Sequence, residues 1–235
     1  MDLERKTARK IGAVVQDWVA PDVPSSNLLL GHYCRLEALD LEKHGADLFE
    51  AYQLDTEGRS WTYLPYEPFD NLGAYLDWIR QSALGVDPLF YAILDSASEH
   101  AVGVASYLNI VPEHGRIEVG HINYSPQLQR TTAATEAMYL MMKYALELGY
   151  RRYEWKCDAL NKSSRLAAGR LGFKFEGVHR QHVIVKGRNR DTAWYSVLGT
   201  EWPGLKEVFQ RWLEPSNFDG DGQQITRLSA LTTAP

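Results

Sequence analysis

The chain has 235 residues, 45% of them hydrophobic and 11% aromatic, which is enough apolar surface for the core of one large domain or two small ones. A formal net charge of −5 argues against a nucleic-acid-binding protein, because neutralising phosphates needs a basic surface. The charged N-terminus lacks the apolar run of a signal peptide, and no stretch has the roughly 18 apolar residues that span a bilayer. We therefore predict a cytoplasmic protein that binds neither nucleic acid nor membrane.

The two cysteines, Cys34 and Cys157, stand far apart and belong to no CxxC pair or Cys/His cluster. Such cysteines are typical of buried thiols in a reducing compartment, and we expect no metal site. The composition along the chain predicts three parts. An extended N-terminal arm covers 1–30, where Trp18 and the neighbouring valines are expected to anchor it, a domain covers 31–200, and a helix with a flexible polar tail covers 201–235.

Hydrophobic periodicity predicts the elements of the domain in chain order. Asp40 is expected to be the N-cap of the first helix and Asp70 that of the second, with an aromatic, Pro-containing loop over 55–69 between them. The predicted strands are 28–39, 88–94, 101–111, 115–124, 150–157, 173–186 and 192–198, and the predicted helices are 41–53, 70–83, 133–148, 161–171 and 203–213.

This order of elements predicts the fold class. The strands at 88–94, 101–111 and 115–124 follow one another with short links, as in an antiparallel meander. The strand at 150–157 is reached through a helix and is therefore expected to run parallel to the strand at 115–124. We predict an α/β protein with a mixed, mostly antiparallel central sheet and helices on both faces.

The helix over 133–148 is the most apolar of the chain and carries only three charged residues. Glu136, Lys143 and Glu147 are seven and four residues apart, which places them on one face, and we expect that face to lie in water. A polar turn over 129–132 leads into the helix. Unpaired N–H groups and the positive end of the helix dipole make this start an anion site, although threonines before a helix are also ordinary caps.

Three stretches resemble the GNAT acyl-CoA-dependent N-acetyltransferases, and among them the RimJ/RimL-like branch that acetylates ribosomal-protein N-termini. The resemblance covers about 30–200. The stretches are the sequence QRTTAATEA at 129–137, the pattern N-x-x-S at 161–164 running into R-L-G-F at 170–173, and the sequence FEGV at 175–178 with the hairpin that ends near Trp194 and Tyr195.

The resemblance implies acetyl-CoA as co-substrate and an amine as acceptor. A homodimer formed through the sheet edge or the C-terminal helix is a separate hypothesis. The pyrophosphate would lie on the N–H groups of the 130–135 segment, and a basic cluster at Lys162, Arg165 and Arg170 would suit the 3′-phosphate. The cofactor-binding residues implied are Gln129, Arg130, Thr131, Thr132, Ala133, Ala134, Thr135, Asn161, Ser164 and Arg165.

Two positions depart from the family pattern. Thr132 stands where the family usually has its first glycine, and threonine is stiffer than glycine. Ala168 stands where several branches have a tyrosine as general acid, so the resemblance leaves that role to Ser164. These departures keep a second hypothesis open, a non-catalytic module that binds or senses acyl-CoA. Larger donors such as succinyl-CoA also stay open.

The resemblance favours Glu118 as the general base that deprotonates the amine. His121 is a rival because a histidine titrates near neutral pH, and Glu154, Asp158 and His182 also lie in or beside strands expected to line the cleft. Water is a further alternative, since an amine can lose its proton through a chain of solvent molecules. Catalytic roles are thus predicted for Glu118, Ser164 and His121.

Overall fold

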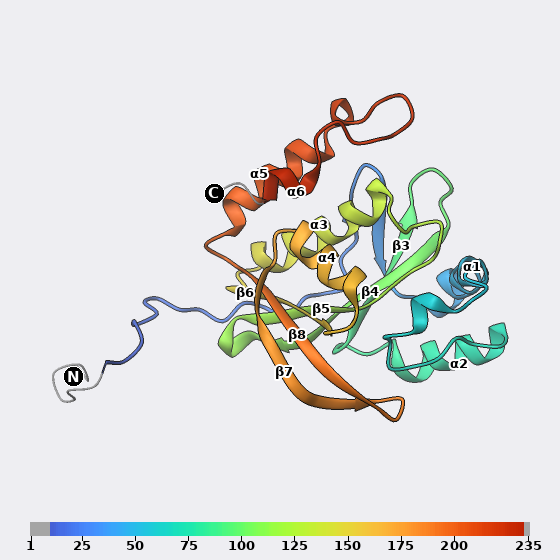
Figure 1. Cartoon of the computed structure of the whole chain (residues 1–235), viewed down its shortest axis with the longest axis horizontal. Coiled ribbons are helices and arrows are strands. Elements are labelled where there is room, and N and C mark those ends of the chain that lie inside the picture. The colour runs from blue at the N-terminus through green and yellow to red at the C-terminus, as the bar shows by residue number, and fades with distance from the viewer. Residues whose placement is uncertain (1–9, 233–235) are drawn as a thin grey trace.

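The computed structural model describes residues 10–232 and has the predicted α/β class (Figure 1). One eight-stranded sheet has the order β1-β2-β3-β4-β5-β6-β8-β7. Its strands are β1 (Leu29–Leu30), β2 (Cys34–Ala38), β3 (Leu89–Asp95), β4 (Ala101–Val111), β5 (Arg116–Tyr124), β6 (Arg152–Asp158), β7 (Lys174–Val185) and β8 (Arg188–Leu198). The helices are α1 (Leu41–Gln53), α2 (Leu72–Ser82), α3 (Thr132–Glu147), α4 (Lys162–Arg170), α5 (Trp202–Leu213) and α6 (Leu228–Thr232).

The pairing of strands confirms the predicted topology. The strands β3 to β5 form the predicted antiparallel meander, and β1 and β2 extend the sheet antiparallel to it on the β3 side. β5 and β6 are parallel, β8 returns antiparallel to β6, and β7 pairs antiparallel with β8. The parallel pair follows from α3, which carries the chain back across the sheet before β6 begins. The central sheet is therefore mixed and mostly antiparallel.

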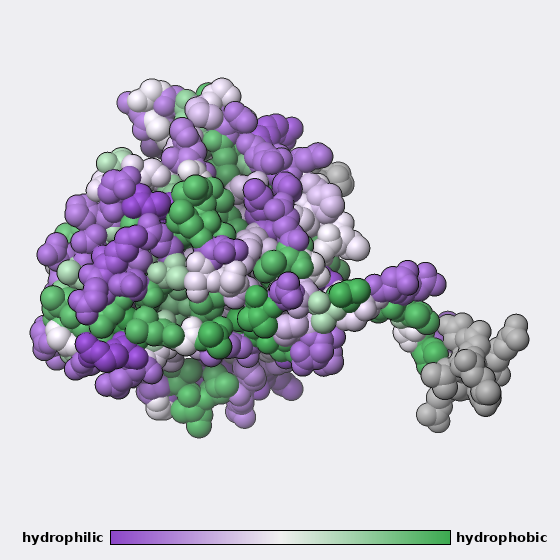
Figure 2. Space-filling view, turned by 180° about the vertical axis from the view of Figure 1, so that it is seen from behind, coloured by the Kyte–Doolittle hydropathy of each residue, from purple (hydrophilic) through white to green (hydrophobic). Residues whose placement is uncertain are grey.

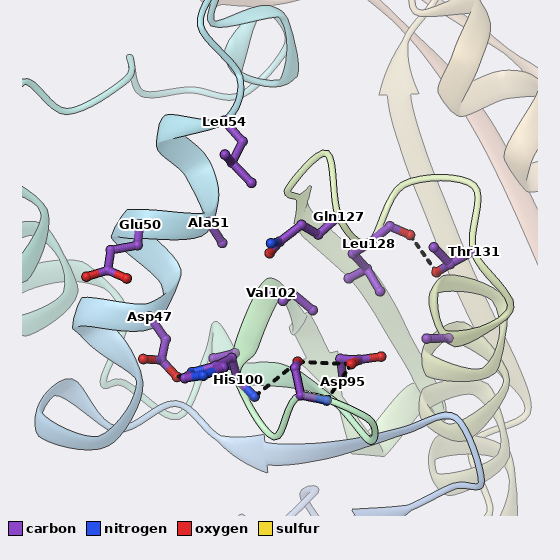
Figure 3. Close-up of a pocket in the computed structure, with 13 residues that line it drawn as sticks. Asp47, Glu50, Ala51, Leu54, Asp95, His100, Val102, Gln127, Leu128 and Thr131 are labelled. Carbon is purple, nitrogen blue, oxygen red and sulfur yellow. Dashed lines mark hydrogen bonds and ion pairs between the residues drawn. The ribbon is translucent and has the colours of Figure 1, made fainter.

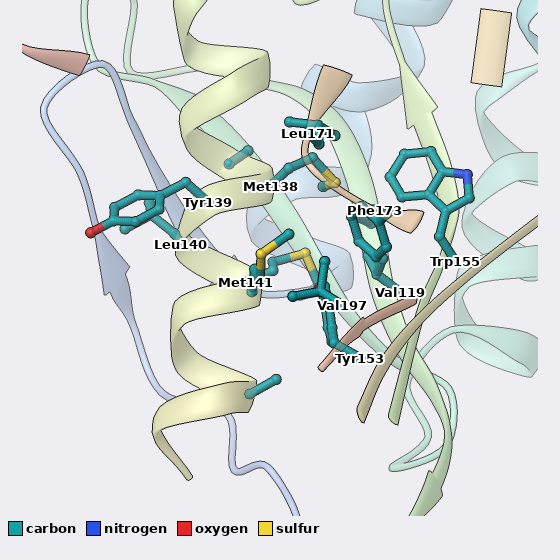
Figure 4. Packing of buried hydrophobic residues seen from close by; sticks show 14 of the residues in the cluster. Val119, Met138, Tyr139, Leu140, Met141, Tyr153, Trp155, Leu171, Phe173 and Val197 are labelled. Atoms are coloured by element: carbon teal, nitrogen blue, oxygen red, sulfur yellow. The ribbon is translucent and has the colours of Figure 1, made fainter. Parts of the chain in front are cut away.

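Two hydrophobic clusters cover opposite faces of the sheet. The helices α1 and α2 pack on one face, where Leu48 and Ile79 are fully buried. On the other face α3 presents Met138 and Met141 to Val119, Tyr153 and neighbouring side chains of β5 and β6 (Figure 4). Each fully buried side chain of this size stabilises the fold by about 1.5–3 kcal/mol. The helices thus cover both faces, as predicted.

The charged face of α3 differs from its prediction. Glu136 is only 4% exposed, and its carboxylate accepts the backbone N–H groups of His32, Tyr33 and Cys34 at 2.8, 2.6 and 2.9 Å. These three N–H groups lie in the tight turn between β1 and β2, so the predicted single strand over 28–39 is broken there. The carboxylate satisfies donors that the turn leaves without backbone partners, which offsets the cost of its burial.

The N-terminal arm is extended over residues 10–28 and is held at few points; residues 1–9 lie outside the described part. Trp18 packs on Gly115 and Arg151 and donates its indole N–H to the Glu113 carbonyl at 3.3 Å. Gly115 has a φ of +61°, and a Cβ there would lie 2.3 Å from the Trp18 ring. Both the backbone angle and the close approach of the ring therefore require glycine at this position. The valines do not hold the arm, since Val14 and Val19 are 77% and 81% exposed. The arm projects from the domain and carries apolar residues on its surface (Figure 2).

The C-terminal segment is more ordered than its polar composition predicts. Leu228 is fully buried, Thr232 donates its hydroxyl to the Arg170 carbonyl at 3.2 Å, and Phe218 packs against Trp212. Residues 214–232 therefore lie against α4 and α5, whereas a flexible tail is predicted from Glu214 onward. Residues 233–235 lie outside the described part, and the division of the chain at 30 and 200 stays a prediction.

Smaller differences concern element ends. The second helix is capped by Asn71, whose side chain accepts the Ala74 N–H, and Asp70 is not the cap. The turn of the last hairpin is only Lys186–Gly187, so 188–191 is strand and not loop. Asp40 caps α1 as predicted, accepting the Lys43 N–H at 2.8 Å.

Candidate functional site

The parallel strands β5 and β6 separate half-way along their length. Their register runs from Arg116 opposite Arg152 to Val119 opposite Trp155 and ends there. β5 continues to Tyr124 and β6 continues to Asp158, each paired only on its outer side. The inner edges of both strands beyond Val119 and Trp155 therefore offer backbone hydrogen-bonding groups to an extended ligand.

The loop from β5 to α3 brings a helix N-terminus to the end of the separated strands. Thr131 is the N-cap of α3, accepts the Ala134 N–H at 3.1 Å and donates its hydroxyl to the Leu128 carbonyl at 2.7 Å. The next two N–H groups, of Thr132 and Ala133, have no acceptor inside the helix. Together with the helix dipole they suit an anionic group.

The backbone conformation of this loop shows whether threonine fits at position 132, where the family usually has a glycine. The left-handed residue is Arg130, with a φ of +63°, whereas Thr132 is the first residue of the helix. Threonine is compatible with that position, so its stiffness does not by itself distort the loop. Among the other predicted residues, Gln129 and Arg130 are exposed, Ala133 and Ala134 are buried, and Gln129 donates to the Tyr124 carbonyl at 2.8 Å.

Glu118 belongs to a buried polar network on the sheet face opposite α3. Its carboxylate Oε2 lies 2.7 Å from Lys156 Nζ and accepts the Asn109 amide N–H at 2.7 Å. Lys156 Nζ also lies 3.1 Å from Glu154 Oε2 and 3.9 Å from the centre of the Trp194 ring. Alternating side chains explain the arrangement, because Glu118, Glu154 and Lys156 all point away from the apolar face under α3.

The two carboxylates of this network differ in pKa. Burial raises the pKa of Glu118 above its ordinary value, and the attraction of Lys156 and its hydrogen bond offset only part of the rise. Burial also raises the pKa of Glu154, but hydrogen bonds from Arg152 and the charge of Lys156 outweigh it, so the net pKa is lowered. Glu118 is therefore the better proton acceptor of the pair.

His121 lies three residues further along β5 in a different environment. Its φ is +48° at a β-bulge, and its ring stacks on Tyr66 and contacts Phe90 at 5.1 Å between ring centres. Burial lowers the pKa of His121, so the neutral imidazole is favoured. His121 thus lies among aromatic side chains, whereas Glu118 lies in the polar network, and the structure does not bring the two into one cluster of contacts.

Asn161 and Ser164 begin α4 beside the end of β6. Asn161 is the N-cap and accepts the Ser164 N–H at 3.0 Å, while the Ser164 hydroxyl accepts the Trp155 indole N–H at 3.0 Å. Because the indole is a donor only, the Ser164 hydroxyl keeps its own hydrogen for another acceptor.

The three basic residues predicted to form one cluster have separate partners. Arg165 donates to the Tyr195 hydroxyl at 3.1 Å and to the Ala159 carbonyl at 3.3 Å. Arg170 donates to the Thr135 hydroxyl at 3.0 Å and lies over the Trp212 ring. Lys162 is exposed. Only Arg170 touches the first turn of α3, so these three residues do not form one compact patch.

The ribbon formed by β7 and β8 extends past the polar face of β5 and β6 to the aromatic segment at 59–67 (Figure 1). Lys186, at the ribbon tip, donates to the Trp61 carbonyl at 2.9 Å and pairs with Glu67 at 3.0 Å. Tyr63 donates to the Leu160 carbonyl at 3.3 Å. The ribbon and the aromatic segment thus enclose the polar face of β5 and β6.

A hollow of about 500 Å³ borders the start of α3 on the side of α1 (Figure 3). Asp47, Glu50 and Asp95 line it, and Asp47 lies 2.9 Å from the His100 ring nitrogen. Three carboxylates repel an anion, so this hollow is unsuited to a phosphate. Over residues 10–232 no group of three or more His, Cys, Asp or Glu side chains is arranged to hold a metal ion. No helix in the same range is both long and apolar enough to cross a membrane.

Two members of the polar network, Lys156 and Asn109, are absent from the residues predicted from the sequence. A signal for Lys156 exists, because the sequence over 152–158 alternates apolar and charged residues, which places Glu154, Lys156 and Asp158 on one face. No such signal exists for Asn109, which reaches Glu118 across the β4–β5 pair.

Comparison with known proteins gives concordant matches. The profile of the acetyltransferase (GNAT) domain matches residues 35–174. A crystal structure of a GCN5-related N-acetyltransferase from Brucella melitensis is 44% identical, covers 94% of this chain and all of its own, and superposes with a TM-score of 0.91.

Two curated bacterial proteins are similar in sequence. The uncharacterized N-acetyltransferase p20 of Bacillus licheniformis is 26% identical over 174 residues, which is 72% of this chain and 96% of that protein. YdaF of Bacillus subtilis, described as a candidate ribosomal N-acetyltransferase, is 29% identical over 131 residues, 55% of this chain and 69% of its own length.

Proposed function

We propose that this chain, which belongs to the GNAT acetyltransferase family, transfers the acetyl group of acetyl-CoA directly to a primary amine while both are bound. The observation that carries the proposal is the separation of β5 from β6 beside the free first turn of α3. An extended thiol ester with a diphosphate needs this combination of a strand-like slot and an anion site.

The donor would be held along this slot. The pantetheine arm would bond to the inner edges of β5 and β6 and reach Asn161, and the diphosphate would lie on the N–H groups at the start of α3. The residues proposed for donor binding are Gln129, Arg130, Thr131, Thr132, Ala133, Ala134, Thr135, Asn161, Ser164 and Arg165.

Glu118 would act as the general base. Its carboxylate takes a proton from the acceptor ammonium, and the free amine nitrogen attacks the thioester carbonyl carbon. The C–S bond breaks as the C–N bond is completed, and the second proton of the nitrogen passes to the leaving thiolate, which departs as the thiol. The Ser164 hydroxyl, which accepts the Trp155 indole N–H, would donate its own hydrogen in a hydrogen bond to the leaving thiolate. His121 is the rival base, because burial keeps its imidazole neutral.

The acceptor proposed is a peptide N-terminus or a small amine. Similarity to YdaF supports a ribosomal-protein acceptor and the RimJ/RimL-like branch. The homodimer, formed through the sheet edge or the C-terminal helix, stays a prediction from the sequence, as do the cytoplasmic location and the lack of nucleic-acid and membrane partners.

Charge at the first residue of α3 tests the donor site. Thr132→Glu places a carboxylate where the helix dipole stabilises it by about 0.3–1 kcal/mol, so the fold is retained while a diphosphate is repelled. Thr132→Gln is the neutral control of the same size. We expect the KM for acetyl-CoA to rise more than about tenfold in the first variant only, a difference of about 1.4 kcal/mol. Thiol release from acetyl-CoA with a panel of amines measures it.

Two results would contradict the proposal. One is the absence of thiol release with every amine tried, whether acetyl-CoA or succinyl-CoA is the donor. The other is an equal KM for acetyl-CoA in both variants, which would mean that the diphosphate does not lie at the start of α3. A preference for succinyl-CoA would keep the donor site and change the acyl group.

A further inference from the structure

The outer part of the β7–β8 ribbon is strongly basic in a protein that is acidic overall. Between Val178 and Thr192 there are four basic residues and one acidic residue, whereas the whole chain has a net charge of −5. The basic residues are Arg180, Lys186, Arg188 and Arg190, and the acidic residue is Asp191.

Three of these basic side chains make no direct contact with an anionic group, although Arg180 attracts the Asp191 carboxylate at longer range. Lys186 pairs with Glu67, but over residues 10–232 the guanidinium groups of Arg180, Arg188 and Arg190 form no ion pair and no hydrogen bond. Arg190 Nε is buried without an acceptor. Asp191 does not neutralise them by contact, since its carboxylate accepts the Gln181 N–H at 2.7 Å and the Asn189 amide at 3.0 Å. Donors of this kind bind carboxylate or phosphate groups.

The ribbon places two of these side chains, Arg188 and Arg190, beside the enclosed polar face. β8 has no bulge, so Arg188 and Arg190 lie on the same face as Thr192 and Trp194, and the Trp194 ring lies over Lys156. Alternate residues on a strand are about 6.8 Å apart, which matches the spacing of alternate side chains on an extended peptide. A polar hollow of about 650 Å³ lies on the opposite face of the ribbon, between Arg180, Gln181, Asn189 and Asp191, because Asn189 and Asp191 alternate with Arg188 and Arg190.

We propose that the β7–β8 ribbon binds carboxylates of an extended acidic peptide, whose free N-terminus is thereby directed towards Glu118. This inference rests on the proposed function and adds the class of acceptor. A peptide fits better than a nucleic acid, because the ribbon is an isolated basic surface on an acidic protein. Several separated guanidinium groups also suit a chain of carboxylates better than a single phosphate.

Two matched peptides test the proposal in the full-length protein with acetyl-CoA. They share their first three residues, and alternate later positions carry Glu in one and Gln in the other. We expect kcat/KM to be about tenfold higher for the acidic peptide, the order that two exposed ion pairs supply. The difference should lie in KM and should shrink between about 0.05 and 0.5 M salt as screening increases.

Arg188→Gln combined with Arg190→Gln removes the two charges on the ribbon face that carries Trp194. The acidic peptide should then lose its advantage, whereas Arg211→Gln, which neutralises a single exposed residue on α5, should preserve it. Calorimetric binding of both peptides gives a second readout that does not need turnover.

The outcomes separate this inference from the proposed function. Turnover with equal kcat/KM for both peptides overturns the inference and keeps the acetyltransferase. Acidic-peptide binding that the double variant loses, without turnover of any amine, supports the ribbon site and overturns the proposed reaction. Binding of oligouridine in preference to the acidic peptide overturns the inference in favour of an RNA. A double variant that changes only the oligomeric state overturns it in favour of a second copy of the chain.

Discussion

The two faces of β5 and β6 are built from alternate residues of the same strands and have opposite chemistry. Towards α3, Ile117, Val119 and Tyr153 are buried among methionines. Towards the ribbon, Glu118 and Lys156 carry charges that are almost as deeply buried, with side chains 7% and 11% exposed. Burial therefore does not separate the two faces, but hydrogen-bonding partners do.

This difference shows where stability and activity are expected to reside. The apolar face stabilises the fold through buried area and close packing. The polar face retains carboxylates and an ammonium that are costly to bury, and replacing such groups with apolar ones is often neutral or stabilising. Substitutions on the two faces should accordingly affect different quantities.

The largest effect is expected on the polar face. Glu118→Gln removes the proposed base and should lower kcat by about 10²- to 10⁴-fold, the usual contribution of general base catalysis. Lys156 keeps Glu154 as a partner, so the melting temperature should change little. Steady-state thiol release and calorimetry measure the two quantities.

His121→Gln is the matched control for this substitution. It should change kcat much less than Glu118→Gln. A full rate in Glu118→Gln together with a large loss in His121→Gln would transfer the base to His121.

On the apolar face Met141→Ala should destabilise the protein by about 2–5 kcal/mol, because it leaves a cavity between α3 and the sheet. Urea unfolding gives the free energy of unfolding. The folded fraction should keep its kcat. A large loss of kcat in fully folded protein would mean that the two faces are coupled.

Lys156→Gln tests how the polar face sets the pKa of its base. The attraction of Lys156 lowers the pKa of Glu118 and offsets part of the rise that burial causes. Removing the ammonium should therefore raise this pKa, and the acid limb of the pH profile of kcat/KM should move to higher pH.

Lys206→Gln, which breaks the more exposed pair with Glu147, should leave the profile in place. A profile that stays in place in Lys156→Gln as well would mean that Glu118 does not titrate on this limb.

The smallest effect is expected at Glu37, a carboxylate that serves structure. Burial raises the pKa of Glu37, but hydrogen bonds from Lys43 and Arg35 outweigh it and lower the pKa from about 4.5 to about 2. The ionised form is thus favoured by folding, so its stabilisation is present above about pH 4.5 and is lost as the pH falls towards 2. Glu37→Gln should flatten the stability curve in this window, as measured by urea unfolding at several pH values.

A different pH response is expected at Glu118, whose pKa is raised. Its protonated form is favoured by folding, so this contribution to stability is lost as the pH rises through the folded pKa. If the free energy of unfolding depended on pH in the same way in Glu37→Gln and Glu118→Gln, the contrast between the two sites would be contradicted.

Much of the fold follows from local sequence signals. The Asp40 cap, the β4 strand, the α3 helix and the parallel direction of β6 depend on capping, periodicity and connection rules that act over a few residues. The resemblance of three stretches, at 129–137, 161–173 and 175–195, likewise identified the acetyltransferase family before any contact was known.

The features that the sequence patterns did not predict depend on contacts between residues that are distant in the chain. Glu136 has the spacing of an exposed residue, but three N–H groups about 100 residues earlier bind it. The segment after Glu214 is polar in composition, yet Leu228 is fully buried. Local patterns carry no record of such partners, because a buried polar group and an exposed one can have the same neighbours in sequence.

The sequence by itself determined the order of strands and helices and the alternation that gives β6 one apolar and one charged face. Only the tertiary structure decided that Lys156 lies between Glu118 and Glu154, that the β7–β8 ribbon encloses this face, and that three arginines on the ribbon have no ion-pair partner over residues 10–232. The reason is physical. Periodicity sets which side of an element a residue faces, whereas strand pairing and loop closure set what it faces.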